Sequence, residues 1–215
     1  MAIETAREQK MKLSQLPFNW FDSFLLIWLA MGIFLGRKRG MSVEVLTFLQ
    51  WFGVVIICGV TYEPAATWLV QTSDMFSPLF SSVLAYLLIA GLVALAFSFL
   101  KRSLGSKLAG SDTFGKTEYY LGMLTGMVRF ACMLIFALAL LNARFYTPQE
   151  IKASKKFQMD NYDSEFFPGL QTLQASVFEE SFTGPPIKRY LGFILIAPKP
   201  ATHGKTFKQQ EWKGP

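Results

Sequence analysis

The chain has 215 residues, of which 52% are hydrophobic and only 17% are charged, and its net charge is +6. Charged residues make up about a quarter of an ordinary soluble domain, so this composition indicates an integral membrane protein. The positive charge does not indicate a nucleic-acid partner, because the basic residues cluster beside apolar runs, as membrane-flanking charges do.

The chain begins with a polar segment, 1–17, which we expect to form a short surface helix that ends at Pro17. A first membrane span is expected at about 18–36. It carries Asp22 in its first turn, where the helix dipole favours a carboxylate. A tight basic loop ending at Gly40 follows it.

A second span is expected at about 43–62, closing before Glu63 and Pro64. Glu44 lies at its beginning, as either an N-terminal dipole partner or a functional carboxylate. A third span at about 78–100 has no charge and ends before Lys101.

Residues 103–117 are rich in Gly and Ser and predict a surface loop. The fourth span, at about 119–142, carries Arg129 near its middle. A central arginine costs about +2.5 to +3.5 kcal/mol on an insertion scale, so it needs a structural explanation. Gly122 and Gly126 precede it and form a G-x3-G pair, which lets another helix approach closely.

Arg129 is therefore expected at a protein interface. It is either a packing group satisfied by neighbouring carbonyls or a group that serves conduction or substrate binding. Glu44 is the most plausible acidic partner. However, Arg129 lies roughly 16 Å along its helix from Glu118 whereas Glu44 begins its own helix, so the expected depths argue against a direct salt bridge.

The composition turns polar after residue 145, and we expect 146–215 to lie outside the membrane. Apolar positions at helical spacing predict an amphipathic helix at about 166–181, lying either on the membrane or against the bundle. The apolar run 191–197 is too short to span, and 198–215 is predicted to be disordered.

The loop charges predict the orientation. The loops after the first and third spans carry three and four basic residues, whereas the second loop carries none. The positive-inside rule then places the first and third loops in the cytoplasm and both termini outside. Basic residues flanking the termini oppose this assignment, but the hairpin loops are short and tied to helices at both ends.

Three motifs, in order and spacing, resemble the colicin V production protein family, CvpA, over roughly residues 18–145. They are Trp20-Phe21-Asp22, then Arg39-Gly40 with Glu44 and Trp51, and finally Glu118-x2-Leu121-Gly122-x3-Gly126-x2-Arg129. The chain departs from the family in having Phe130 where Gly is frequent and Glu118 where Asp is frequent.

The resemblance implies a four-helix protein of the bacterial inner membrane, from a family named for a requirement in producing or exporting the toxin colicin V. Some members carry an extracytoplasmic protease domain after the fourth helix, which agrees with termini outside. No such triad can be built here, because the only histidine after residue 145 is His203 and no nucleophile motif is present.

We therefore expect an all-α integral membrane protein with four transmembrane helices and an amphipathic C-terminal helix. The expected function is a non-enzymatic scaffold that supports toxin production, toxin export or envelope maintenance. The alternative is a small oligomeric channel or transporter in which Arg129, helped by Glu44 or Asp22, lines the path.

No cofactor or metal is expected, since Cys58 and Cys132 fall inside apolar spans and no phosphate loop or HExxH signature occurs. The expected partners are the lipid bilayer and either a second copy of the chain or another envelope protein.

Overall fold

The fold is all-α, with four long apolar helices. The computed structural model describes residues 18–72, 77–109, 117–146 and 169–200. Its long helices are α2 (Trp20–Arg39), α3 (Met41–Thr72), α4 (Pro78–Ala109) and α5 (Glu118–Asn142). Each is long and apolar enough to cross a membrane. The surface helix predicted within 1–17 lies outside the described residues.

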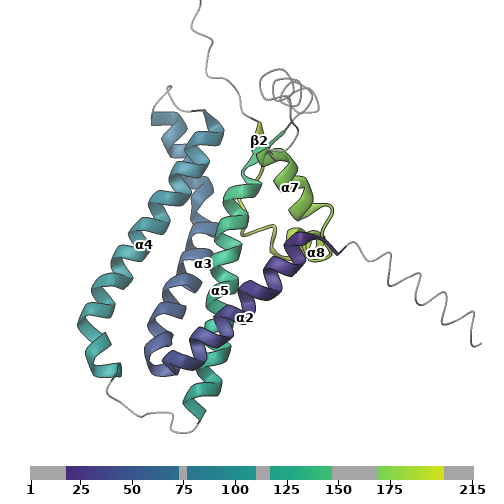
Figure 1. Cartoon of the computed structure of the whole chain (residues 1–215). Helices are drawn as coiled ribbons and strands as arrows, with labels where there is room; N and C mark the ends of the chain where they lie inside the picture. Colours follow the sequence, from purple (N-terminus) through teal and green to yellow (C-terminus); the bar gives the residue numbers. More distant parts are fainter. Residues whose placement is uncertain (1–17, 73–76, 110–116, 147–168, 201–215) are drawn as a thin grey trace, which may run out of the picture.

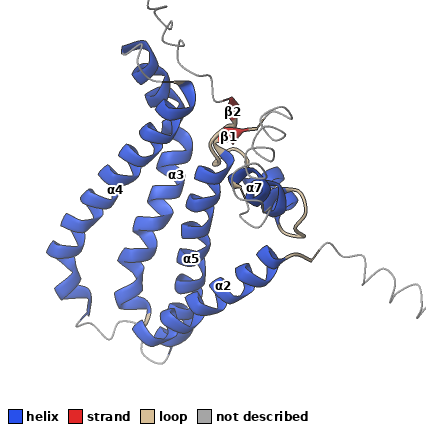
Figure 2. Ribbon diagram, turned by 45° about the horizontal axis from the view of Figure 1, so that its top comes forward, coloured by secondary structure: helices blue, strands red, loops and turns tan. Residues whose placement is uncertain are grey.

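The four helices stand side by side in the order α4, α3, α5, α2 (Figures 1 and 2). The bundle expected from the sequence is thus an open row. The two inner helices are more buried than the two outer ones: 39% of the residues in the span of α5 are buried, but only 17% of those in the span of α4. The row leaves α4 with a broad apolar face that the described protein does not cover.

The turn between α2 and α3 is a single residue, Gly40, whose φ of 74° favours glycine. The basic loop expected before it is instead helical, because Arg37–Arg39 form the last turn of α2. Basic side chains there also complement the negative end of the helix dipole.

Helices α3 and α4 run further than predicted. Helix α3 continues through Glu63 and Pro64 to Thr72. Proline is tolerated inside such helices because side-chain hydroxyls, waters and neighbouring helices re-satisfy the backbone. Helix α4 continues past Lys101 to Ala109, so half of the predicted loop 103–117 is helical and 110–116 lies outside the described residues.

The C-terminal part folds back against the long helices (Figure 1). It contains α7 (Leu170–Phe178), α8 (Gly184–Leu191) and a two-stranded parallel sheet of β1 (Arg144–Phe145) and β2 (Lys199–Pro200). Of the two positions left open for the amphipathic helix, the structure shows the one against the protein. The prediction of disorder is wrong at residues 199 and 200, which pair with β1, while 201–215 lies outside the described residues.

The core lies where this C-terminal part meets the helices. Val177 and Phe178 of α7 join the main apolar cluster together with Leu195 and Ile196. The segment after α8 is therefore buried although it is too short to span. It is held through polar contacts as well: Asn142 Nδ2 donates to the Ile196 carbonyl at 2.9 Å, and the amide of Ala197 donates to the Tyr62 hydroxyl at 3.0 Å.

Candidate functional site

A buried ion pair joins α3 and α5 in the half of the row nearest the Gly40 turn. Arg129 Nη1 donates to Glu44 Oε2 at 2.5 Å, and the two side chains are only 6% and 1% exposed. Removing charges from water is costly unless they are paired and hydrogen-bonded. Each of these two charges therefore depends on the other.

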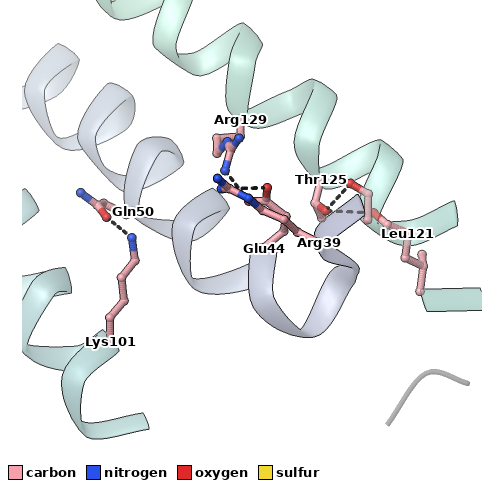
Figure 3. A network of polar contacts seen from close by, with 8 residues as sticks. Arg39, Glu44, Gln50, Lys101, Leu121, Thr125 and Arg129 are labelled. Carbon is pink, nitrogen blue, oxygen red and sulfur yellow. Dashed lines mark hydrogen bonds and ion pairs between the residues drawn. The ribbon is translucent and has the colours of Figure 1, made fainter. Parts of the chain in front are cut away.

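Arg39 of α2 is the third charged residue at this place, and we call Arg39, Glu44 and Arg129 together the charge cluster. Its Nη1 lies 3.6 Å from Glu44 Oε1, and its side chain is half exposed (Figure 3). This distance exceeds hydrogen-bonding range, so the contact is electrostatic. The carboxylate of Glu44 therefore lies between a buried arginine and one that reaches solvent.

Glycines bring the helices close enough for this arrangement. A Cβ added at Gly122 would lie 2.5 Å from the carbonyl oxygen of Gly36, and one added at Gly126 would lie 2.8 Å from the Gly36 Cα. The backbones of α2 and α5 therefore touch, as the G-x3-G pair predicted. Beyond them, the ring of Phe130 packs against Gly32, so the departure from glycine at position 130 does not prevent close packing.

The structure corrects the expectation that Glu44 and Arg129 are too far apart in depth for a direct contact. The backbone of Gly40 lies against Gly122, since a Cβ added at Gly122 would lie 3.0 Å from the Gly40 Cα, so α3 starts about one turn beyond the start of α5. Glu44 lies about 6 Å further along α3, which brings it about level with Gly126. Arg129 is three residues beyond Gly126, so its long side chain reaches Glu44 across less than one turn.

A second polar contact extends the cluster toward α4. Lys101 Nζ donates to Gln50 Oε1 at 2.5 Å, and it lies within electrostatic range of Arg129 and Glu44 (Figure 3). The sequence marks Lys101 only as a charge that follows the third span. The structure places it inside the 32-residue helix α4, where its side chain can reach α3.

Asp22 makes a separate polar site at the start of α2. Its carboxylate is 2% exposed and accepts hydrogen bonds from the amides of Asn19, Phe182 and Thr183, each at 3.0 Å, and from the Thr183 hydroxyl at 2.6 Å. The first contact is part of a capping box, as its place in the first turn favours. The others attach the connection between α7 and α8 to α2.

Asn19 and Trp20 reinforce this attachment. Asn19 Nδ2 and Trp20 Nε1 both donate to the Ser176 hydroxyl of α7, at 2.6 and 3.0 Å. None of these contacts between α2 and the C-terminal part could be read from the first motif alone, because their partners lie more than 150 residues away.

The predicted residues therefore divide into two groups. The structure brings together Arg39, Gly40, Glu44, Glu118, Gly122, Gly126 and Arg129 at the base of α2, α3 and α5. Asp22 lies at the other end of α2 and bonds to Asn19, Phe182 and Thr183, so the structure does not join it to Arg129. Trp51 packs its ring on Phe136, 5.9 Å between centroids, and takes no part in the ion pair.

The charge cluster holds α2, α3 and α5 together by electrostatic attraction. Two arginines, Arg39 and Arg129, contact the carboxylate of Glu44, and Lys101 is bonded to Gln50 further along the row. Within the described part of the chain, no group of three His, Cys, Asp or Glu side chains could hold a metal ion. Among those same residues, Arg129 Nε is buried and has no hydrogen-bond partner.

One comparison with known proteins gives a match. A family model described as colicin V production protein matches residues 21–196. The match extends beyond residue 145, where the sequence motifs end, and takes in α7, α8 and the buried segment after them. No curated protein and no solved structure matches the chain.

Proposed function

The chain belongs to the colicin V production protein family, and on that premise we propose that it is a non-enzymatic scaffold of the bacterial inner membrane. In this role it supports production or export of a colicin V type of toxin, or maintenance of the envelope. The family is not a known enzyme family. Four apolar helices and the family make the chain a multi-pass membrane protein.

The open row of helices is the observation that carries the scaffold proposal. Among the described residues, the four long helices form a row and not a closed ring, and polar side chains between neighbouring helices pair with one another: Glu44 with Arg129, and Lys101 with Gln50. These pairs join α3 to α5 and to α4. On α4, Leu92 and Leu95 are 67% and 58% exposed and belong to the broad uncovered face. A row of helices with an uncovered face fits a component that binds other membrane proteins.

The functional test uses a bacterium that makes a colicin V type of toxin and lacks this chain. Reintroducing the wild-type chain should raise the amount of toxin in the medium. A loss of export leaves toxin inside the cells, whereas a loss of production lowers toxin in both places. If the chain changes neither the amount of toxin inside the cells nor the amount in the medium, it has no role in toxin production or export.

The scaffold role is tested separately with a photo-cross-linking residue at Leu95. We expect a cross-link to an envelope protein or to a second copy of the chain. The same residue placed at Tyr86, which is fully buried, is the matched control and should give none. Cross-links to lipid alone at Leu95 would contradict the scaffold.

A second candidate, an oligomeric channel or transporter, is favoured by one observation. Two arginines contact the one carboxylate of Glu44, a formal excess of one positive charge, and Arg129 Nε is buried without a partner in the described part of the chain. Intramembrane charges of this kind often mark a solute path. Anion flux through liposomes that contain the purified protein, lost in Arg129→Leu, would establish the channel in place of the scaffold.

A further inference from the structure

A groove separate from the charge cluster opens between the end of α2 and the start of α5. Its volume is about 840 Å³, within the usual range for ligand pockets. It is lined by Phe34, Arg37 and Lys38 of α2 and by Tyr119, Tyr120 and Met123 of α5. Phe34 lies three and four positions before Arg37 and Lys38, and Met123 lies four and three positions after Tyr119 and Tyr120, so each set lies on one side of its helix.

The mouth of the groove is cationic. Arg37 and Lys38 lie in the last turn of α2, and the ion pairs of the described residues include neither of them. The lining contains no acidic side chain, and nearby Glu118 lies against Gly40. Lys38 Nζ lies 4.5 Å from the centre of the Phe34 ring, which holds the ammonium group over the groove.

The rest of the lining suits an amphiphile better than a small ion. Phe34 and Met123 lie about one turn further into their helices than the basic residues and Tyr119, and they offer an apolar wall. Tyr119 and Tyr120 are 58% and 72% exposed, and tyrosine rings favour the level of lipid headgroups. Both α2 and α5 are long and apolar enough to cross a membrane, so a groove at their ends lies at the level of the lipid headgroups.

From this placement we propose that the groove binds an anionic phospholipid. The lipid phosphate contacts Arg37 and Lys38, with the phenol groups of Tyr119 and Tyr120 beside it, and the start of an acyl chain lies along Phe34 and Met123. Free inorganic phosphate offers the same anionic chemistry but cannot use the apolar wall. The two ligands are therefore separable by experiment.

The test measures binding of short-chain phosphatidylglycerol, phosphatidylcholine and inorganic phosphate to the purified full-length protein in a neutral detergent. The double variant Arg37→Gln, Lys38→Gln removes the cationic mouth. Each basic residue near an anionic lipid contributes about a fivefold factor in affinity, so we expect phosphatidylglycerol to bind roughly thirtyfold more weakly. The charge-exchange variant Arg37→Lys, Lys38→Arg should bind within about threefold of wild type.

The matched control is Arg102→Gln, Arg189→Gln, which removes two exposed positive charges outside the groove. It should leave the affinity within about twofold of wild type. Equal binding of phosphatidylcholine and phosphatidylglycerol, or equal losses in the two double variants, would overturn the proposal. Competition by submillimolar inorganic phosphate would show that a free anion occupies the site and would overturn the lipid. If the double variant does not fold, each single variant should lose about fivefold, and unchanged affinity in both would refute the proposal.

Discussion

Breaking the pair between Glu44 and Arg129 should strongly destabilise the protein. Arg129→Leu leaves Glu44, 1% exposed, with only the half-exposed Arg39 at 3.6 Å. Glu44→Gln leaves the buried guanidinium of Arg129 near Lys101 with no carboxylate beside it. Removing one partner of a buried pair costs about 3–5 kcal/mol, and we expect that range for each single variant.

Coupling between the two residues gives the more specific prediction. The double variant, Glu44→Gln with Arg129→Leu, leaves no unpaired charge from this pair. It should therefore cost about 2 kcal/mol less than the sum of the two single variants. The matched control is Arg39→Leu, whose partly exposed contact should be worth about 1 kcal/mol or less.

The free energy of unfolding is measured on purified full-length variants in mixed micelles of rising SDS fraction, followed by tryptophan fluorescence. The amount of membrane-inserted protein in cells gives a second readout. Strictly additive losses would refute the coupling. Normal insertion and stability of Arg129→Leu, with loss of activity only, would assign Arg129 to transport or partner binding and not to the structural pair.

Three further predictions concern the helix contact, the docked C-terminal part and the orientation. Gly122→Ala should lower the free energy of unfolding by about 2 kcal/mol or more, because the new methyl meets backbone atoms; Gly91→Ala, with nothing within 4 Å, should be neutral or slightly stabilising. Asp22→Asn keeps one acceptor oxygen but puts an NH₂ group where the other oxygen accepts from two amides, so it should speed proteolysis near residue 182, whereas the exposed Glu179→Gln should not. Gln71→Cys should react with an impermeant thiol reagent in intact spheroplasts; protection there would reverse the predicted topology.

The long helices and the glycine contact follow from the sequence because their physical signals are local. An apolar run of spanning length predicts a helix wherever it occurs, and α5 begins within one residue of its predicted start. Gly122 and Gly126 predict close contact with another helix, because small residues let helix backbones approach each other in membranes. The same pattern does not name the other helix, which the structure shows to be α2, at Gly32 and Gly36.

The depth of the ion pair and the docking of the C-terminal part could not be read in this way. The depth of Glu44 depends on the one-residue turn at Gly40 and on the contact of Gly40 with Gly122, and the second of these is a tertiary feature. Burial of the segment after α8 depends on Gly59, where an added Cβ would lie 2.9 Å from Ile194 Cγ2. Neither Gly40 nor Gly59 can be told from the other glycines of the chain by composition or periodicity.

The glycine contact and the ion pair are parts of one arrangement. Contact between Gly36 and Gly122 fixes where α2 ends against α5, and the single-residue turn at Gly40 then fixes where α3 begins. Glu44 is four residues further on, so its depth is set by a backbone contact in which it takes no part. A side chain at Gly122 would separate α2 from α5 and carry the start of α3 with it. The arginine that is costly in lipid is therefore neutralised by a carboxylate whose position depends on a contact between glycines of α2 and α5.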